Sequence, residues 1–218
     1  MACSDMRRPV NVTRLLVLPL IAITVLLATG VPLRARDMSA AISYLYTSVS
    51  IQPPTASQMT VCYGFVCRRR MDLHFTDADR RQLTVLFAGA KASAEAERRA
   101  VQQAMVWFDK RVGPIIGTDK RIARADFRYF QDQQNFDCWD TTRNATSLLF
   151  VMQDWGLLRH HAIGDPVYRG NVLVLQTPHN SAVLIEKANG NDWVVDMWTR
   201  SYAQLPDVQR VATWMKED

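Results

Sequence analysis

The 218-residue chain predicts an α+β domain, in which helices pack on an antiparallel sheet. Apolar residues recur at helical spacing through the first part of the domain, as far as Gly156. After Gly156 the pattern changes to short alternating runs that are rich in Val, Leu and Ile. The dipeptide Asn189-Gly190 separates two of these runs, and Asn-Gly is the strongest short signal for a hairpin. The length is sufficient for one domain with its own core and a terminal appendage.

The N-terminal segment predicts export. An uncharged apolar run over residues 15–33 follows three arginines, and this pattern indicates a signal peptide or a single membrane anchor over residues 1–36. Residues 28–30 are small enough for cleavage by a signal peptidase. We therefore expect the protein to be periplasmic, either exported or tethered to the inner membrane through residues 15–33.

A tether is expected over residues 37–59, which contain a Pro-Pro pair and Ser/Thr-rich flanks, and the α+β domain over residues 60–218. One or two short strands are expected around a loop that carries Cys62 and Cys67. In an oxidising compartment this spacing favours a local disulfide. Half of a zinc site is the alternative, although the chain has no second Cys or His pair at ligand spacing.

Three helices are expected in the first part of the domain. Thr76 is a suitable N-cap for the first helix, with Asp79 where the acid of a capping box lies. Helical periodicity then covers residues 93–112, and Gly113-Pro114 is expected to end that helix. The third helix begins at Cys138. Strands follow in three short runs, at residues 172–175, 182–185 and 193–197.

Cys138 lies between two aspartates at the start of its helix. Asp137 is expected to be the N-cap, and Asp140 lies in the first turn, where the helix dipole favours a carboxylate. The same dipole lowers the pKa of a thiol and favours the nucleophilic thiolate. The alternative is a small buried cysteine that packs like an alanine.

Downstream residues provide Cys138 with partners. His179 is expected at the start of one strand and Asp196 on the next. Thiol catalysis needs a thiolate, an imidazole that takes and returns a proton, and a carboxylate that fixes the tautomer of the imidazole. The sequence therefore predicts that Cys138, His179 and Asp196 are catalytic. Taken singly, His179 fits a surface histidine, and the partner of Asp196 could instead be Arg200.

The register of the strands is a difficulty for this triad. A two-residue turn at Asn189-Gly190 would place Asp196 opposite Val183, which is four residues from His179. The triad then requires a bulge or a different turn. The supporting groups are less certain from the sequence: Gln134 and the backbone N–H of Cys138 are candidate oxyanion donors, and Asp140 is a candidate supporting carboxylate.

The segment Asp137-Cys138-Trp139-Asp140, together with His179 and Asp196, resembles the transglutaminase-like branch of the papain-like cysteine peptidases. In that superfamily Asp-Cys-x-Asp opens the central helix, and His and Asp lie on neighbouring strands. The resemblance covers roughly residues 60–200. The whole stretch, together with residues 141–146 and 155–160, also resembles a group of proteobacterial exported proteins, and the Cys62–Cys67 segment fits that group too.

This resemblance implies a papain-like or transglutaminase-like core with the nucleophilic cysteine at a helix N-terminus. It also implies an exported cysteine hydrolase or acyltransferase that acts on the amide bonds of a protein or peptide substrate. The alternative is a catalytically silent binding or assembly protein of the cell envelope that retains the fold.

Other classes of function are disfavoured. A metal site of Cys138, His179 and the pair His160-His161 fits poorly, because adjacent residues on a strand point to opposite faces. We expect neither a metal nor another cofactor. The net charge is +5, and the one basic triplet, at residues 68–70, lacks interleaved aromatic residues, so nucleic-acid binding is not expected.

Overall fold

The computed structural model describes residues 38–171, 173 and 176–217, within a compact unit that begins at Asp37. The predicted signal or anchor lies outside the described residues. Within the part of the chain that is described, no helix is both long enough and apolar enough to cross a membrane.

The unit is a mixed α+β structure, as predicted, with a two-stranded sheet and a four-stranded sheet, both antiparallel. The helices are α1 (Ala40–Thr47), α2 (Asp77–Leu86), α3 (Ala94–Ile116), α4 (Cys138–Asp154) and α5 (Val211–Trp214), with short 3-10 turns at Ala90–Ala92 and Phe127–Tyr129. The small sheet pairs β1 (Gln58–Tyr63) with β2 (Arg69–His74). The larger sheet has the order β3-β4-β5-β6, with β3 (His161–Arg169), β4 (His179–Glu186), β5 (Asn191–Asp196) and β6 (Asp207–Arg210).

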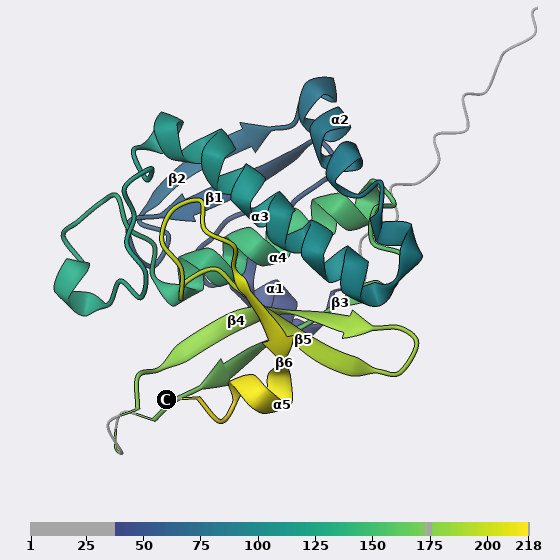
Figure 1. Cartoon of the computed structure of the whole chain (residues 1–218). Helices are drawn as coiled ribbons and strands as arrows, with labels where there is room; N and C mark the ends of the chain where they lie inside the picture. The colour runs from purple at the N-terminus through teal and green to yellow at the C-terminus, as the bar shows by residue number, and fades with distance from the viewer. Residues whose placement is uncertain (1–37, 172, 174–175, 218) are drawn as a thin grey trace, which may run out of the picture. The chain divides into compact units, whose positions relative to one another are not determined.

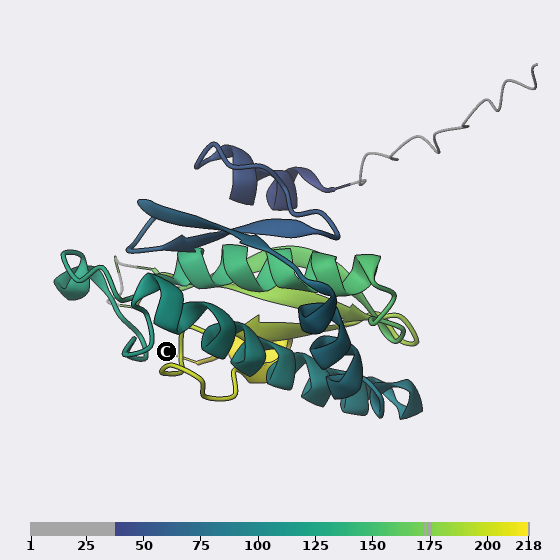
Figure 2. The same ribbon diagram turned by 90° about the horizontal axis from the view of Figure 1, so that it is seen from above.

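Helix α4 is the central element. Figures 1 and 2 show α3 on one side of α4, α1 and the β1–β2 hairpin on the other, and the four-stranded sheet below it in the view of Figure 1. Every residue of α4 from Asp140 to Met152 is buried. The expected apolar face (Leu148, Leu149, Met152) packs in the main core, while the polar residues of α4 bond other elements. These bonds join Thr142 to Asn180, Arg143 to the carbonyl of Leu45, Asn144 to the backbone of Cys62, and Ser147 to Tyr46.

The segment expected to be a tether belongs to this packed unit. Helix α1 is N-capped by Ser39, and its buried residues Ile42, Leu45 and Tyr46 pack with Phe150 of α4. The proline pair and the polar flanks therefore accompany an ordered segment, which starts the unit well before residue 60.

Two predicted helix boundaries have different outcomes. The capping box at Thr76 is present, with Asp79 in the expected role. Helix α3, however, runs through Pro114 and ends at Gly117, which has a φ of 74°. Gly113 does not end this helix, and a Cβ there would lie 2.5 Å from Cε2 of Tyr202, so the glycine permits close packing.

The strands also differ from the prediction. Strand β3 was not predicted, and residues 172, 174 and 175 of the expected first strand lie outside the described residues. Strands β4 and β5 are joined by four residues, 187–190, because Glu186 pairs with Asn191. Val183 consequently faces Val194 and not Asp196, so the predicted register was wrong by two residues. The observed register continues to place Asp196 opposite Ser181, two residues from His179 and on the same face.

Candidate active site

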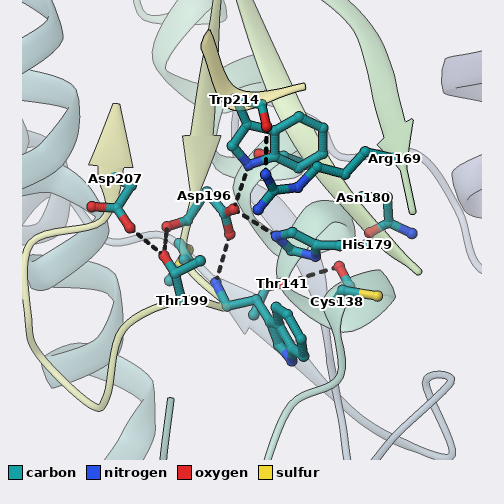
Figure 3. Close-up of polar contacts among 12 residues, drawn as sticks. Cys138, Thr141, Arg169, His179, Asn180, Asp196, Thr199, Asp207 and Trp214 are labelled. Carbon is teal, nitrogen blue, oxygen red and sulfur yellow. Dashed lines mark hydrogen bonds and ion pairs between the residues drawn. The ribbon is translucent and has the colours of Figure 1, made fainter. Parts of the chain in front are cut away.

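His179 and Asp196 form a buried pair at the end of the sheet. Nε2 of His179 lies 2.6 Å from Oδ2 of Asp196, and both side chains are almost completely buried. The corrected register explains this contact, because β4 begins at His179 and β5 ends at Asp196. No bulge between these two strands is needed. Figure 3 shows the two side chains directed toward each other.

The carboxylate of Asp196 accepts two further hydrogen bonds. The indole Nε1–H of Trp214 donates to Oδ2 at 2.9 Å, and the backbone N–H of Trp198 donates to Oδ1 at 3.1 Å. Arg200, which we considered as an alternative partner, is paired with Asp207 instead. The buried carboxylate of Asp196 therefore accepts hydrogen bonds from protein groups at both oxygens, as a buried charged group requires.

The imidazole of His179 has one bonded and one unbonded nitrogen. Its ring lies between the rings of Trp198 and Trp214, at centroid distances of 4.4 and 5.3 Å. With Nε2 bonded to Asp196, the buried Nδ1 has no hydrogen-bond partner among the described residues. In Figure 3 this second nitrogen is drawn on the side of Cys138.

Cys138 opens α4, with Asp137 as its N-cap, and is half-buried. Oδ1 of Asp137 accepts the backbone N–H of Asp140 at 2.7 Å, which confirms the predicted cap. Asn180, the neighbour of His179, connects β4 to this helix start. In the amide orientation that satisfies its neighbours, Asn180 donates to the carbonyl of Cys138 at 2.7 Å and accepts from the indole of Trp139 at 3.3 Å. The start of β4 and the first turn of α4 are thus joined directly.

The pKa of Cys138 differs from the sequence-based expectation. Burial, and secondly the negative charge of Asp137, raise the pKa of the thiol to about 12. A hydrogen bond from the backbone N–H of Asn180 to the thiol opposes this shift and does not overcome it. The dipole argument was wrong because it neglected the desolvation of the thiolate and the carboxylate next to it.

The predicted disulfide between Cys62 and Cys67 is present, and Asp140 holds its loop. Residues 64–67 all have positive φ, so successive backbone N–H groups turn toward the start of α4. Asp140 accepts the N–H groups of Phe65 and Cys67, at 2.9 and 2.7 Å, and Asp137 accepts that of Val66 at 2.8 Å. Burial, and then repulsion by Asp137, raise the pKa of Asp140 to about 8. Asp140 is thus a structural support of the site.

Cys138 borders a pocket of about 660 Å³. The wall contains the disulfide loop, the turn at residues 125–128, the start of α4, the segment before His179, and Trp198. Its lining residues are Phe65, Val66, Ala125, Asp126, Phe127, Arg128, Asp137, Cys138, Trp139, Gln176, Thr177, Pro178 and Trp198. Gln134 is not among the described residues that line it. The side-chain amide of Gln134 donates to Asp132 instead, which leaves the backbone N–H of Cys138 as the remaining oxyanion candidate.

The two neighbouring histidines lie elsewhere. His161 begins β3 and pairs with Glu186, whereas Arg169 at the other end of β3 pairs with His179. The Nδ1 atom of His161 is bonded to Glu97 at 2.9 Å, and His160 contacts the carbonyl of Lys91. Within residues 38–171, 173 and 176–217, no three His, Cys, Asp or Glu side chains are grouped so as to hold a metal ion.

Two contributors to the site were not predicted. Trp214 comes from α5, a short helix that no sequence pattern predicts, and Asn180 lies next to His179 in β4. No sequence motif connects Trp214 with the residues of the site. Asn180 directly follows His179, but its bond to the first turn of α4 depends on how β4 packs against that helix, which the sequence does not show.

Compared with known proteins, the chain matches no family model, no curated protein and no solved structure. A thiol beside a pocket, an imidazole with one unbonded nitrogen and a buried carboxylate are together the groups that acyl transfer to sulfur requires.

Proposed function

We propose that the protein is a cysteine hydrolase or acyltransferase that acts on amide bonds in a protein or peptide substrate. The supporting observation is the imidazole of His179: Asp196 occupies its Nε2, and its Nδ1 is buried, unbonded and on the side of Cys138. A histidine held in this tautomer is suited to accept a proton at Nδ1. The resemblance of this arrangement to the transglutaminase-like branch of papain-like peptidases supports the same proposal.

In the proposed reaction, the S–H bond of Cys138 breaks as its proton moves to Nδ1 of His179. The sulfur attacks the carbonyl carbon of the substrate, and the backbone N–H of Cys138 faces the oxygen that becomes negative. The imidazolium then gives its proton to the leaving amine, and an acyl thioester remains on Cys138. Water or a second amine resolves this thioester and thereby decides between hydrolysis and transfer.

The raised thiol pKa is compatible with this sequence of steps. A thiol with a pKa of about 12 is protonated at neutral pH, so the thiolate is not preformed. Proton transfer to His179 creates a positive charge on the side of Cys138, and a positive neighbour lowers a thiol pKa. The nucleophile is then generated during the attack and not before it.

The same pKa favours a second candidate function. A thiol that stays protonated fits a catalytically silent protein of the cell envelope that uses the pocket only for binding. In either case we infer an exported protein, periplasmic or associated with the inner membrane through residues 15–33. The disulfide supports an oxidising compartment.

The rate of alkylation of Cys138 by iodoacetamide, measured from pH 6 to pH 10, separates the two candidates. Peptide mapping distinguishes Cys138 from Cys3, which the sequence also contains. If His179 accepts the thiol proton, we expect His179→Ala to slow alkylation at pH 7 by about tenfold or more. His74→Ala, at an exposed position on β2, is the matched control and should react at the wild-type rate.

The contrary outcome is equally clear. If wild type and His179→Ala react at equal rates that only rise with pH, His179 does not activate the thiol. The silent binding protein would then be the better description.

A further inference from the structure

We propose that Trp214 is a positioning residue, whose indole N–H fixes the Asp196 carboxylate and thereby the tautomer of His179. This inference rests on the proposed function, because it assigns Trp214 a part in preparing His179 for the thiol proton. Trp214 is four residues from the end of the chain and completely buried.

The hydrogen bonds of Asp196 carry the proposal. Its Oδ2 accepts from Nε2 of His179 at 2.6 Å and from Nε1 of Trp214 at 2.9 Å, while the backbone N–H of Trp198 occupies Oδ1 at 3.1 Å. An indole N–H can only donate, so Trp214 distinguishes a carboxylate oxygen from a protonated one. Without this donor, the carboxyl group keeps only the bonds to His179 and to the backbone N–H of Trp198, and its orientation is less firmly fixed.

Trp214 also has an electrostatic effect. The indole N–H lies against a carboxylate oxygen of Asp196, and a donor in this position stabilises the negative charge of a carboxylate. An ionised Asp196 accepts the proton of Nε2 and leaves Nδ1 as the basic nitrogen of His179. Cys138, whose thiol pKa Asp196 helps to raise, then has Nδ1 as its proton acceptor.

The indole of Trp214 is itself held in place by β3, the strand next to His179 in the sheet. Arg169 of β3 pairs in register with His179, and its guanidinium lies over the ring of Trp214, 4.3 Å from the centroid. The same Arg169 donates to the backbone carbonyls of Trp214 and Glu217. Helix α5 is therefore fastened to β3, and Figure 3 shows Arg169 and Trp214 together above His179.

Trp214→Phe tests this role, since phenylalanine keeps an aromatic ring against His179 and removes the N–H. We expect alkylation of Cys138 at pH 7 to slow by about tenfold or more, as for the loss of one hydrogen bond to a charged group. We also expect the far-downfield proton resonance of the short Nε2–H bond to move. Trp107→Phe is the matched control, because the N–H of Trp107 donates to Gln82 on the surface of α2 and α3.

Unchanged alkylation and an unchanged proton resonance in folded Trp214→Phe would overturn the proposal. This result is distinguishable from failure of the proposed function, in which His179→Ala itself has no effect. A structural role alone would lower the unfolding midpoint and leave the proton resonance in place.

A second measurement applies if Trp214→Phe does not fold. In wild type labelled with ¹⁵N-tryptophan, the six indole resonances are assigned by replacing the other five tryptophans one at a time. Asp196→Asn should shift the Trp214 resonance more than any other. If another indole shifts most, Trp214 does not bond Asp196 in solution and the proposal fails.

Discussion

The described part of the chain contains two buried histidine–carboxylate pairs that differ at one ring nitrogen. His161 is bonded to Glu97 at 2.9 Å and His179 to Asp196 at 2.6 Å, and all four side chains are almost completely buried. The second nitrogen of His161 lies 3.2 Å from the guanidinium of Arg98. The second nitrogen of His179 has no partner among the described residues.

The surroundings of the two pairs differ as well: one pair joins structural elements, and the other lies beside the pocket. Glu97 accepts the backbone N–H groups of three consecutive residues, 159–161, so this pair fastens α3 to the start of β3. The pair of His179 is next to the first turn of α4, whose Cys138 borders the pocket. Burial and a carboxylate partner are therefore common to both, and only an unbonded nitrogen near a nucleophile indicates chemistry.

The largest expected effect concerns the structural pair. Glu97→Ala leaves three backbone N–H groups and His161 without their acceptor, so we expect unfolding to become easier by about 3–5 kcal/mol. Urea denaturation measures the change. Alkylation of Cys138 in the folded protein should keep the wild-type rate. A loss below about 1 kcal/mol would show that water replaces the carboxylate, and that the pair does not fasten α3 to the start of β3.

Removal of the disulfide should have the next largest effect on stability. It should affect the site around Cys138 and not the pair of Glu97 and His161. Its loop is short, and chain entropy alone predicts a loss of about 2 kcal/mol for Cys62→Ser combined with Cys67→Ser. Because Phe65 and Val66 line the pocket, alkylation of Cys138 should change as well.

Arg99→Ala, at an exposed ion pair of α3 remote from the disulfide, is the control, and both readouts should stay near wild type. Stability and alkylation both unchanged in the double serine variant would mean that Asp137 and Asp140 hold the loop without the disulfide.

The contrast also shows which features the sequence can predict. Local signals were sufficient for the capping box at Thr76, the N-cap Asp137, the disulfide, and the order of Cys138 before the two strands. Each of these depends on residues that are close in the sequence. The α+β class followed from the change of periodicity alone.

Long-range features were not predictable in the same way. Helix α4 is buried on all sides because Thr142, Arg143 and Asn144 bond groups of distant elements, whereas polar residues in a sequence indicate a solvent-facing side. The position of Asp196 depended on the length of one turn, in which Asn189-Gly190 is only the second half. The thiol pKa depended on burial, which the local dipole argument does not contain.

Matched amide substitutions sharpen the comparison between the two pairs. Asp196→Asn can donate to Nε2 of His179 and so favours the wrong tautomer, which should slow alkylation of Cys138 at pH 7 by about tenfold. Glu97→Gln makes the equivalent change at His161 and should leave that rate at the wild-type value. Equal slowing of alkylation in both variants would contradict a special role for the His179–Asp196 pair, because the two pairs would then affect the thiol only through the stability of the fold.

Glu97 and Asp140 predict opposite pH dependences of stability. Burial alone would raise the pKa of Glu97, but hydrogen bonds from His161 and the adjacent backbone outweigh it and hold that pKa below 4.5. The unfolded chain then binds more protons, so the contribution of Glu97 to stability is present above pH 4.5 and is lost as pH falls through the folded pKa.

Asp140 has the reverse sign. Its pKa is raised from 3.8 to about 8, so the folded protein binds more protons over this range, and stability should decrease as pH rises from about 4 to about 8. Urea midpoints measured across pH for Glu97→Gln and Asp140→Asn test both signs. Glu97→Gln should reduce the loss below pH 4.5, and Asp140→Asn should reduce the decline toward pH 8. A wild-type midpoint that instead rises from pH 5 to pH 8 would mean that Asp140 is ionised in the folded protein. The loop N–H groups of Phe65 and Cys67 would then stabilise its charge more than burial opposes it.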